Sequence, residues 1–527
     1  MAFDRWHRSG YRPRPETERR GRFLFSRLLS AGLNLPAGLA FFFPFLLVLL
    51  AGEARAQQSP GVVLDSREQL FALLAARLAS GVDAAPASEA GLGARQDVMA
   101  YLSRRKIPVG AELQRFFQAM QEDPEVAANL SRLTSLALLM GPPPEFKLSA
   151  PPMDLPPDAR AVAGVAPLVK RFAEEAGLTD LWAQMQPRVE EEIERYSPLV
   201  RRSVEVTDAY LRFPSGAYLG RTYTIFLSPL GTPEQVHARI YGANYYLVVT
   251  PSKEPKIAEI RHQYLHFLLD PLAAKYGLEI EQKIELKPMV RLAPQLGRDF
   301  KEDFSLLVTE CLIRAVELRM DKRPAAEAAK SLEEMAAGGL ILAPYFYAAL
   351  ADYEKQDEPM RLAYKSLILK INPNEERLRL VKVQFAPKLE TGPAGKPQVL
   401  SPEEQLLNQG ENLIAEAKYQ EAAPVFKNVL ETINAQSDRA LFGLAVIYSN
   451  TRKPNLAQDY FKRTLEAAKD VRLSTWSHIY LGRLFDLNGE RDQALAQYRA
   501  ASLTAANYPD ALRAVQDGLQ RPFGFHK

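Results

Sequence analysis

Small and aromatic residues recur at a nearly constant interval in the last quarter of the chain. Ala422, Ala457 and Ala494 are separated by 35 and 37 residues. Such an interval is typical of stacked helical hairpins, in which each unit buries its apolar face only against its neighbours. The recurrence predicts an α-solenoid of three repeats over residues 403–527, with a capping helix at residues 509–520. The other recurring positions are small residues where paired helices approach, Gly410, Ala445 and Gly482, and aromatic residues between repeats, Phe426, Phe461 and Tyr498.

The repeated region resembles tetratricopeptide repeats, whose period is about 34 residues. The resemblance implies a concave groove that binds a protein or peptide partner. Residues 386–402 precede the repeats and are rich in proline and glycine, which is the composition of a linker.

The first 56 residues differ from the rest of the chain. A basic segment with eight arginines precedes an apolar run at residues 35–50, and Ala54 and Ala56 supply the small residues of a cleavage site. This pattern predicts a secretory signal peptide, residues 1–56, and an exported protein that is periplasmic or extracellular, with no stable membrane span after cleavage. An uncleaved N-terminal anchor is the alternative, although the apolar run is short for a span of about 20 residues.

Composition argues against two kinds of interaction. The net charge of +3 depends on residues 1–56, which hold 9 Lys+Arg and 4 Asp+Glu and leave the remaining chain at −2. Nucleic-acid binding is therefore not expected. Cys311 is the only cysteine, so no intrachain disulfide can form.

The chain between the signal peptide and the linker is expected to be mainly α-helical, with one small antiparallel β-sheet. A proline-rich connector at residues 142–157 ends an N-terminal helical region, 57–157, and a second domain occupies residues 158–385. Helices at 179–195 and 198–212 lead into the sheet. Later residues, 278–288, fit a strand or a helix. The sheet is predicted from three β-branched and aromatic runs at residues 223–227, 237–242 and 245–249.

A helix at residues 256–275 follows the sheet and carries two histidines four residues apart. His262 and His266 therefore project from one face, and this spacing lets two imidazoles reach one zinc ion at about 2.0–2.1 Å. In the motif His-Glu-x-x-His the glutamate is the general base, but here that position is Gln263. A distortion of the helix is expected at Asp270-Pro271, because a residue before proline disfavours the α region.

The order of sheet, histidine helix and an apolar helix interrupted by Glu310 resembles the gluzincin-type, zincin-like domain of uncharacterised secreted bacterial proteins. The resemblance implies that His262, His266 and Glu310 are the ligands of a zinc cofactor, and that Asp270 orients an imidazole. It also implies impaired catalysis, because a glutamine cannot accept and return a proton, and loss of a general base costs about 10²–10⁴-fold in rate. Whether the domain is an enzyme stays open.

Other assignments of the same residues remain open at this stage. Arg314, one turn after Glu310, is the partner of that carboxylate if no metal is bound. Glu302 and Glu317 are weaker candidates for the third ligand, because both fall nearer the expected exposed face. The histidines can also form a purely structural pair.

Together these features predict an exported protein with two functional parts. One is a degenerate zinc-metallopeptidase-like domain that binds zinc but is catalytically impaired. The other is a tetratricopeptide array that binds a protein partner. The alternatives are an active zinc-dependent peptidase of unusual mechanism and a metal-free scaffold.

Overall fold

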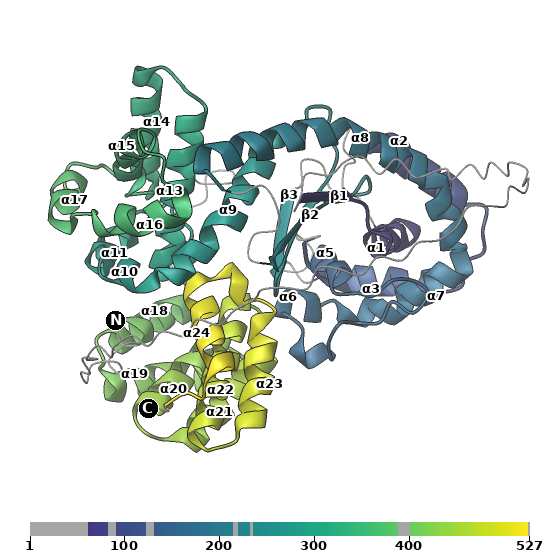
Figure 1. Cartoon of the computed structure of the whole chain (residues 1–527). Helices are drawn as coiled ribbons and strands as arrows, with labels where there is room; N and C mark the ends of the chain where they lie inside the picture. The colour runs from purple at the N-terminus through teal and green to yellow at the C-terminus, as the bar shows by residue number, and fades with distance from the viewer. Residues whose placement is uncertain are drawn as a thin grey trace, which may run out of the picture.

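The computed structural model describes residues 62–82, 91–122, 131–213, 220–231, 236–387 and 401–524. Within these ranges the chain is mostly helical around one small sheet, as expected from the sequence (Figure 1). The predicted signal peptide and most of the predicted linker lie outside the described residues. Among the described helices, none combines the length and the apolar character needed to cross a membrane.

Helix α1 (Glu68–Ala79) is the centre of the first hydrophobic core. Every residue from Gln69 to Leu78 is buried, because five helices pack around α1 (Figure 1). A helix that is buried on all sides has no exposed polar face, which explains its run of leucine and alanine. The surrounding helices are α2 (Leu92–Leu102), α3 (Gly110–Glu122), α5 (Ser131–Leu138), α7 (Ala166–Ala176) and α8 (Leu178–Leu211).

Helix α8 runs through both large hydrophobic cores of the chain. It is a single helix of 34 residues that contains Pro187 and Pro198, whereas the sequence predicted two helices divided before Pro198. That prediction was wrong because it weighed only the local cost of proline, a missing N–H and a steric clash. Leu181 lies in the first core and Val200 in the second, so burial on both sides of Pro198 holds the helix in one piece.

A four-stranded mixed sheet lies between the two cores. The strand order is β1-β2-β4-β3; β1, β2 and β4 are parallel, and β3 is antiparallel to β4. The predicted antiparallel arrangement holds for β3 and β4, and Gly242 in the turn between them has a φ of 62°, which glycine adopts without steric cost. The expectation of a purely antiparallel sheet was wrong, because β4 enters the sheet beside β2 in the same direction. The strands are β1 (Val62–Asp65), β2 (Thr222–Leu227), β3 (Val236–Tyr241) and β4 (Asn244–Val249).

Alternate residues of β4 enter different cores. Tyr245 and Leu247 pack in the second core, whereas Tyr246 and Val248 pack against the first. This period of two is the geometry of a strand that is covered on both faces. The sheet therefore connects the N-terminal helices to the core that contains the histidine helix.

The second core is built around α9 (Ile257–Lys275), the predicted histidine helix, and α13 (Phe304–Met320), which carries Glu310. Helix α9 continues through Pro271 to Lys275, so the expected distortion does not end it. Residues 278–288 fitted a strand or a helix from sequence, and the structure shows that they are largely helical. The other helices of this region are α10 (Gly277–Glu281), α11 (Lys287–Arg291), α12 (Arg298–Glu302), α14 (Ala325–Gly338), α15 (Ala343–Tyr353), α16 (Met360–Leu369) and α17 (Pro373–Leu380).

Three pairs of consecutive helices form the C-terminal array, and α24 packs against the last pair (Figure 1). The buried ring of Phe426 lies where a Cβ atom on Gly410 or Gly443 would be only 2.6 Å away. Gly410 was predicted to let the helices of its hairpin approach, and Gly443 on the next helix makes the same room for the ring. The assignment of these pairs to tetratricopeptide repeats stays a prediction. The helices are α18 (Pro402–Ala415), α19 (Tyr419–Asn428), α20 (Asp438–Asn450), α21 (Pro454–Ala467), α22 (Val471–Leu487), α23 (Arg491–Ser502) and α24 (Pro509–Gln520).

The array contacts the histidine helix directly, because α24 packs on α9 (Figure 1). Leu512 of α24 packs against the second core. At the same junction Arg472 donates to the Asp510 carboxylate at 3.0 Å. Asp303 is buried beside this pair, and its carboxylate accepts a hydrogen bond from the backbone N–H of Leu306 at the start of α13. Burial and the nearby Asp510 carboxylate raise the pKa of Asp303 to about 8.

We expect Asp303→Asn to stabilise the protein progressively as the pH rises. The folded-state pKa of Asp303 lies above its ordinary value of 3.8, so the stability of the protonated carboxyl is complete below pH 3.8 and is lost as the pH rises through about 8. Each unit of such a pKa shift corresponds to about 1.4 kcal/mol. Asparagine keeps an oxygen for the Leu306 N–H and does not ionise.

The measurement is the melting temperature of the variant and the wild type between pH 5 and pH 8. The control is Asp492→Asn, which makes the same change at an exposed position of α23. A difference between Asp303→Asn and the wild type that stays constant with pH would contradict the expectation.

Candidate metal centre

Two imidazoles and one carboxylate meet between α9 and α13. The Nε2 atoms of His262 and His266 lie 3.6 Å and 3.2 Å from the same oxygen, Oε2 of Glu310. The four-residue spacing puts both rings on one face of α9, and α13 packs against that helix. The structure therefore brings together the three residues that the sequence predicted as ligands.

The three residues could hold a metal ion. Each offers one ligand atom, and these atoms all lie within 4.8 Å of one another. Two imidazole nitrogens and a carboxylate oxygen form a donor set that suits divalent transition metals. Glu310 is buried in a helix whose other buried residues are apolar apart from Thr309, and a buried carboxylate requires a cation or hydrogen bonds to offset its loss of water.

Each imidazole is oriented through its other nitrogen. His266 Nδ1 lies 3.0 Å from Asp270 Oδ1, as predicted, and His262 Nδ1 lies 3.2 Å from Glu317 Oε1. Carboxylates in these positions fix the tautomer that leaves Nε2 free to bind a metal. The sequence proposed Glu317 only as a weaker ligand on an exposed face, yet it is nearly buried and serves His262. Glu302, the other weaker candidate, lies on α12 and pairs with Arg298 instead.

Arg314 connects the two glutamates of α13. Its Nε donates to Glu310 Oε1 at 2.7 Å, and its Nη1 donates to Glu317 Oε2 at 3.2 Å. Arg314 is thus the predicted partner of Glu310, but it occupies Oε1, whereas the imidazoles face Oε2. The arginine contact and a metal contact are therefore compatible on the same carboxylate.

Charge around the site favours an ionised Glu310. Burial alone would raise the pKa of Glu310, but the hydrogen bond from His266 and the charges of His262, His266 and Arg314 outweigh it and lower that pKa to about 2. Burial likewise opposes a charged His266, but Asp270 and Glu310 raise the pKa of His266 to about 10. In the metal-free site the positive charge is therefore a proton on His266, held between Asp270 and Glu310, which a bound metal ion would displace.

Gln263 follows His262 on α9 and is held by a residue that the sequence did not indicate. The hydroxyl of Tyr245, on β4, donates to Gln263 Oε1 at 2.7 Å. Because this contact joins a strand to a helix, no spacing within either element reveals it. The glutamine side chain is therefore fixed beside the metal centre.

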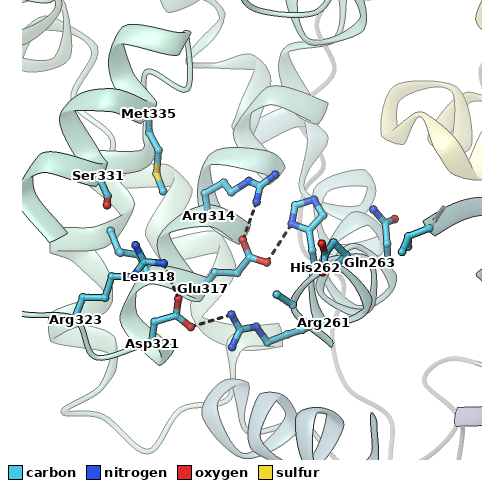
Figure 2. A pocket seen from close by; sticks show the side chains of 13 residues that line it. Arg261, His262, Gln263, Arg314, Glu317, Leu318, Asp321, Arg323, Ser331 and Met335 are labelled. Carbon is cyan, nitrogen blue, oxygen red and sulfur yellow. Dashed lines mark hydrogen bonds and ion pairs between the residues drawn. The ribbon is translucent and has the colours of Figure 1, made fainter. Parts of the chain in front are cut away.

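A cavity of about 460 Å³ opens next to the metal centre. Figure 2 shows Glu317 lying between Arg314 and His262, with Gln263 beside the imidazole. A second ion-pair group also lines the cavity, where Asp321 contacts Arg261 and Arg323. The remaining wall comes from α14 and the edge of the sheet. The lining residues are Val236, Ala258, Glu259, Arg261, His262, Gln263, Arg314, Glu317, Leu318, Asp321, Arg323, Ser331 and Met335.

Comparison of the chain with models of known protein families, with curated proteins and with solved structures found no match. The arrangement of the site therefore has to indicate the function by itself. That arrangement consists of three convergent ligands, two orienting carboxylates and a neighbouring cavity in which a glutamine stands where a general base is expected.

Proposed function

We propose that the chain is an exported protein whose metallopeptidase-like domain binds zinc but hydrolyses peptides poorly, and whose C-terminal array binds a protein partner. The observation that carries this proposal is the convergence of His262, His266 and Glu310 beside Gln263. Two histidines and one glutamate with an open fourth position are a donor set of catalytic zinc sites.

The distances within the site agree with zinc. Ligand atoms bound at about 2.0–2.1 Å in a tetrahedron lie roughly 3.3–3.4 Å apart. The two imidazole nitrogens are 3.6 Å and 3.2 Å from Glu310 Oε2. When bound, zinc supplies a Lewis acid that polarises a carbonyl and acidifies water. Asp270 and Glu317 hold the imidazoles in position for it, and Arg314 holds Glu310.

Poor catalysis is expected because the side chains considered below are unsuited to act as a general base in the cavity. Gln263 can hydrogen-bond a water molecule but cannot take its proton near neutral pH. Tyr264 cannot replace it, because its buried hydroxyl donates to Asp208 at 2.8 Å, away from the cavity. Glu317 and Asp321 are already engaged by imidazole or arginine.

An active peptidase of unusual mechanism is the second candidate, and one observation favours it. Glu259 also lines the cavity, one turn before Gln263, and its nearest ion-pair partner is Lys256 at 3.7 Å. A peptidase using this carboxylate as base would lose its activity in Glu259→Gln, whereas the impaired-enzyme proposal predicts no effect.

Metal analysis of the purified mature chain tests the proposal. We expect one zinc per chain in the wild type and none in His262→Ala. Removing an orienting carboxylate should be milder, so Glu317→Gln should bind zinc about 10–100-fold more weakly. Glu302→Gln is the matched control, because Glu302 is a glutamate of the adjacent helix α12 that contacts no imidazole.

Peptide hydrolysis by the same preparations completes the test. Efficient, zinc-dependent hydrolysis by the wild type would overturn the proposed impairment, and its loss in Glu259→Gln would establish the second candidate. Absence of zinc from the wild type after exposure to the metal would leave a metal-free scaffold.

A further inference from the structure

The side-chain amide of Gln263 has a defined orientation. Its oxygen accepts the hydrogen bond of the Tyr245 hydroxyl at 2.7 Å. Burial raises the pKa of Tyr245 far above its ordinary value, so this phenol keeps its proton and remains the donor. Gln263 also lines the cavity. Because the amide oxygen is occupied, the NH₂ group is the part of this side chain left to face the cavity.

Two arginines that line the same cavity as Gln263 are also hydrogen-bond donors with unused capacity. Arg314 uses Nε and Nη1 on the two glutamates of its helix, and within the described residues no hydrogen bond involves its Nη2. Its side chain is 40% exposed and lines the cavity. Arg323 is 49% exposed, and among the residues that the structure describes it contacts Asp321 through Nη2 alone. Guanidinium groups with free N–H bonds are preferred binding groups for carboxylates.

The acceptors of the cavity are mostly occupied. Glu317 is bound by His262 and Arg314, and Asp321 is bound by Arg261 and Arg323. Glu259 is the exception, and it is half exposed. The lining carries three arginines and three carboxylates, so its formal charges balance. Because most of these carboxylates are already paired, the groups left to bind a ligand at Gln263 and Arg314 are donors, where a general-base glutamate would have offered a negative charge.

We propose that this cavity binds a peptide carboxylate, held by the Gln263 amide and the Arg314 guanidinium. The inference builds on the proposed function, since zinc beside these groups adds positive charge. Glutamine at this position then has a function of its own. It turns a site arranged for cleaving a peptide into one that retains a peptide's acidic group. That group is either a C-terminal α-carboxylate or the side chain of aspartate or glutamate.

Binding of short fluorescent peptides to the zinc-loaded mature chain tests the inference. Fluorescein-labelled Ala-Ala-Ala with a free C-terminus is compared with its C-terminal amide. Fluorescein-labelled Ala-Glu-Ala amide is compared with Ala-Gln-Ala amide. In one of the two pairs we expect the acidic peptide to bind at least about tenfold more tightly than its neutral counterpart, as is typical of a charge-assisted contact. The pair that shows this preference tells whether the bound carboxylate is C-terminal or on a side chain.

Two variants localise the preference. Gln263→Glu should abolish it while leaving zinc content unchanged, and chromatography of the probe checks that binding is read before the variant cleaves it. Tyr245→Phe releases the amide to rotate and should reduce the preference several-fold. Ser331→Ala, on the cavity wall at α14, is the control and should bind like the wild type.

The outcomes separate this inference from the proposed function. If zinc is present and acid and amide peptides bind equally, the carboxylate inference is wrong and the metal centre stands. If zinc does not bind but the acid preference persists and disappears in Gln263→Glu, the carboxylate site stands and the zinc proposal is wrong. A preference that survives Gln263→Glu would place the carboxylate elsewhere and overturn the inference.

Discussion

Replacing Gln263 with glutamate should raise zinc-dependent peptide hydrolysis by about 10²–10⁴-fold over the wild type, the usual effect of a general base. The position follows His262 on α9 and lines the cavity beside the metal centre. The Tyr245 hydroxyl, 2.7 Å from the present amide oxygen, would donate to the new carboxylate and hold it in the same place. The measurement is kcat/KM for a quenched fluorescent peptide, with zinc content determined on the same sample.

Two controls accompany this variant. Gln282→Glu makes the same chemical change at the exposed residue that follows α10 and should leave the rate unchanged. The double variant Gln263→Glu with His262→Ala should lose both zinc and the gained activity. If Gln263→Glu bound zinc and hydrolysed nothing, the cavity would lack more than a base, and the relationship to peptidases would be limited to the metal ligands.

Truncation of Phe426 should cost the C-terminal array about 3–5 kcal/mol, the usual range for a buried Phe→Ala change. Its ring is fully buried and fills the space left by Gly410 and Gly443, where a Cβ atom would be 2.6 Å from it. Helices α18, α19 and α20 meet around this ring, so its removal leaves a cavity between three helices. Urea denaturation gives the change in free energy of unfolding, and hydrogen exchange shows whether the loss is confined to the array.

The control for this truncation is Leu456→Ala. Leu456 lies on the neighbouring helix α21 and is 44% exposed, so its loss should change stability by less than about 0.5 kcal/mol. Zinc content should be the same in both variants. A small effect of Phe426→Ala would mean that the array repacks easily and that the glycines do not specify the approach of its helices.

Local spacing was sufficient to predict most of the side chains that meet at the candidate metal centre. His262, His266 and Asp270 follow one another at intervals of four residues on a single helix, so their relation required no tertiary information. Glu310 was identified because an ionised side chain in an apolar helix needs a partner. Glu317 lies two turns after Glu310 on the same face, and that periodicity contained the signal for its role. The contact of Tyr245 with Gln263 joins two elements, so no pattern within either one predicts it.

The wrong predictions about the fold also concern relations between separate elements. The composition of β2 and β4 predicts strands but not their relative direction, which depends on the path of the chain between them. Residues 62–65 are too few for a periodic pattern, and they form a strand only because β2 is available beside them. Pro198 favours a helix boundary locally, and burial in two separate cores overrides it.

The length of α8 has a consequence for how this chain loses its structure. Its first turns complete the N-terminal core and its last turns complete the core behind the sheet. Unfolding of α8 therefore removes apolar contacts from both cores, so the two cores should melt in one cooperative transition. His262, His266 and Glu310 would then gain or lose their alignment together with helices far from them in sequence, as far away as α1.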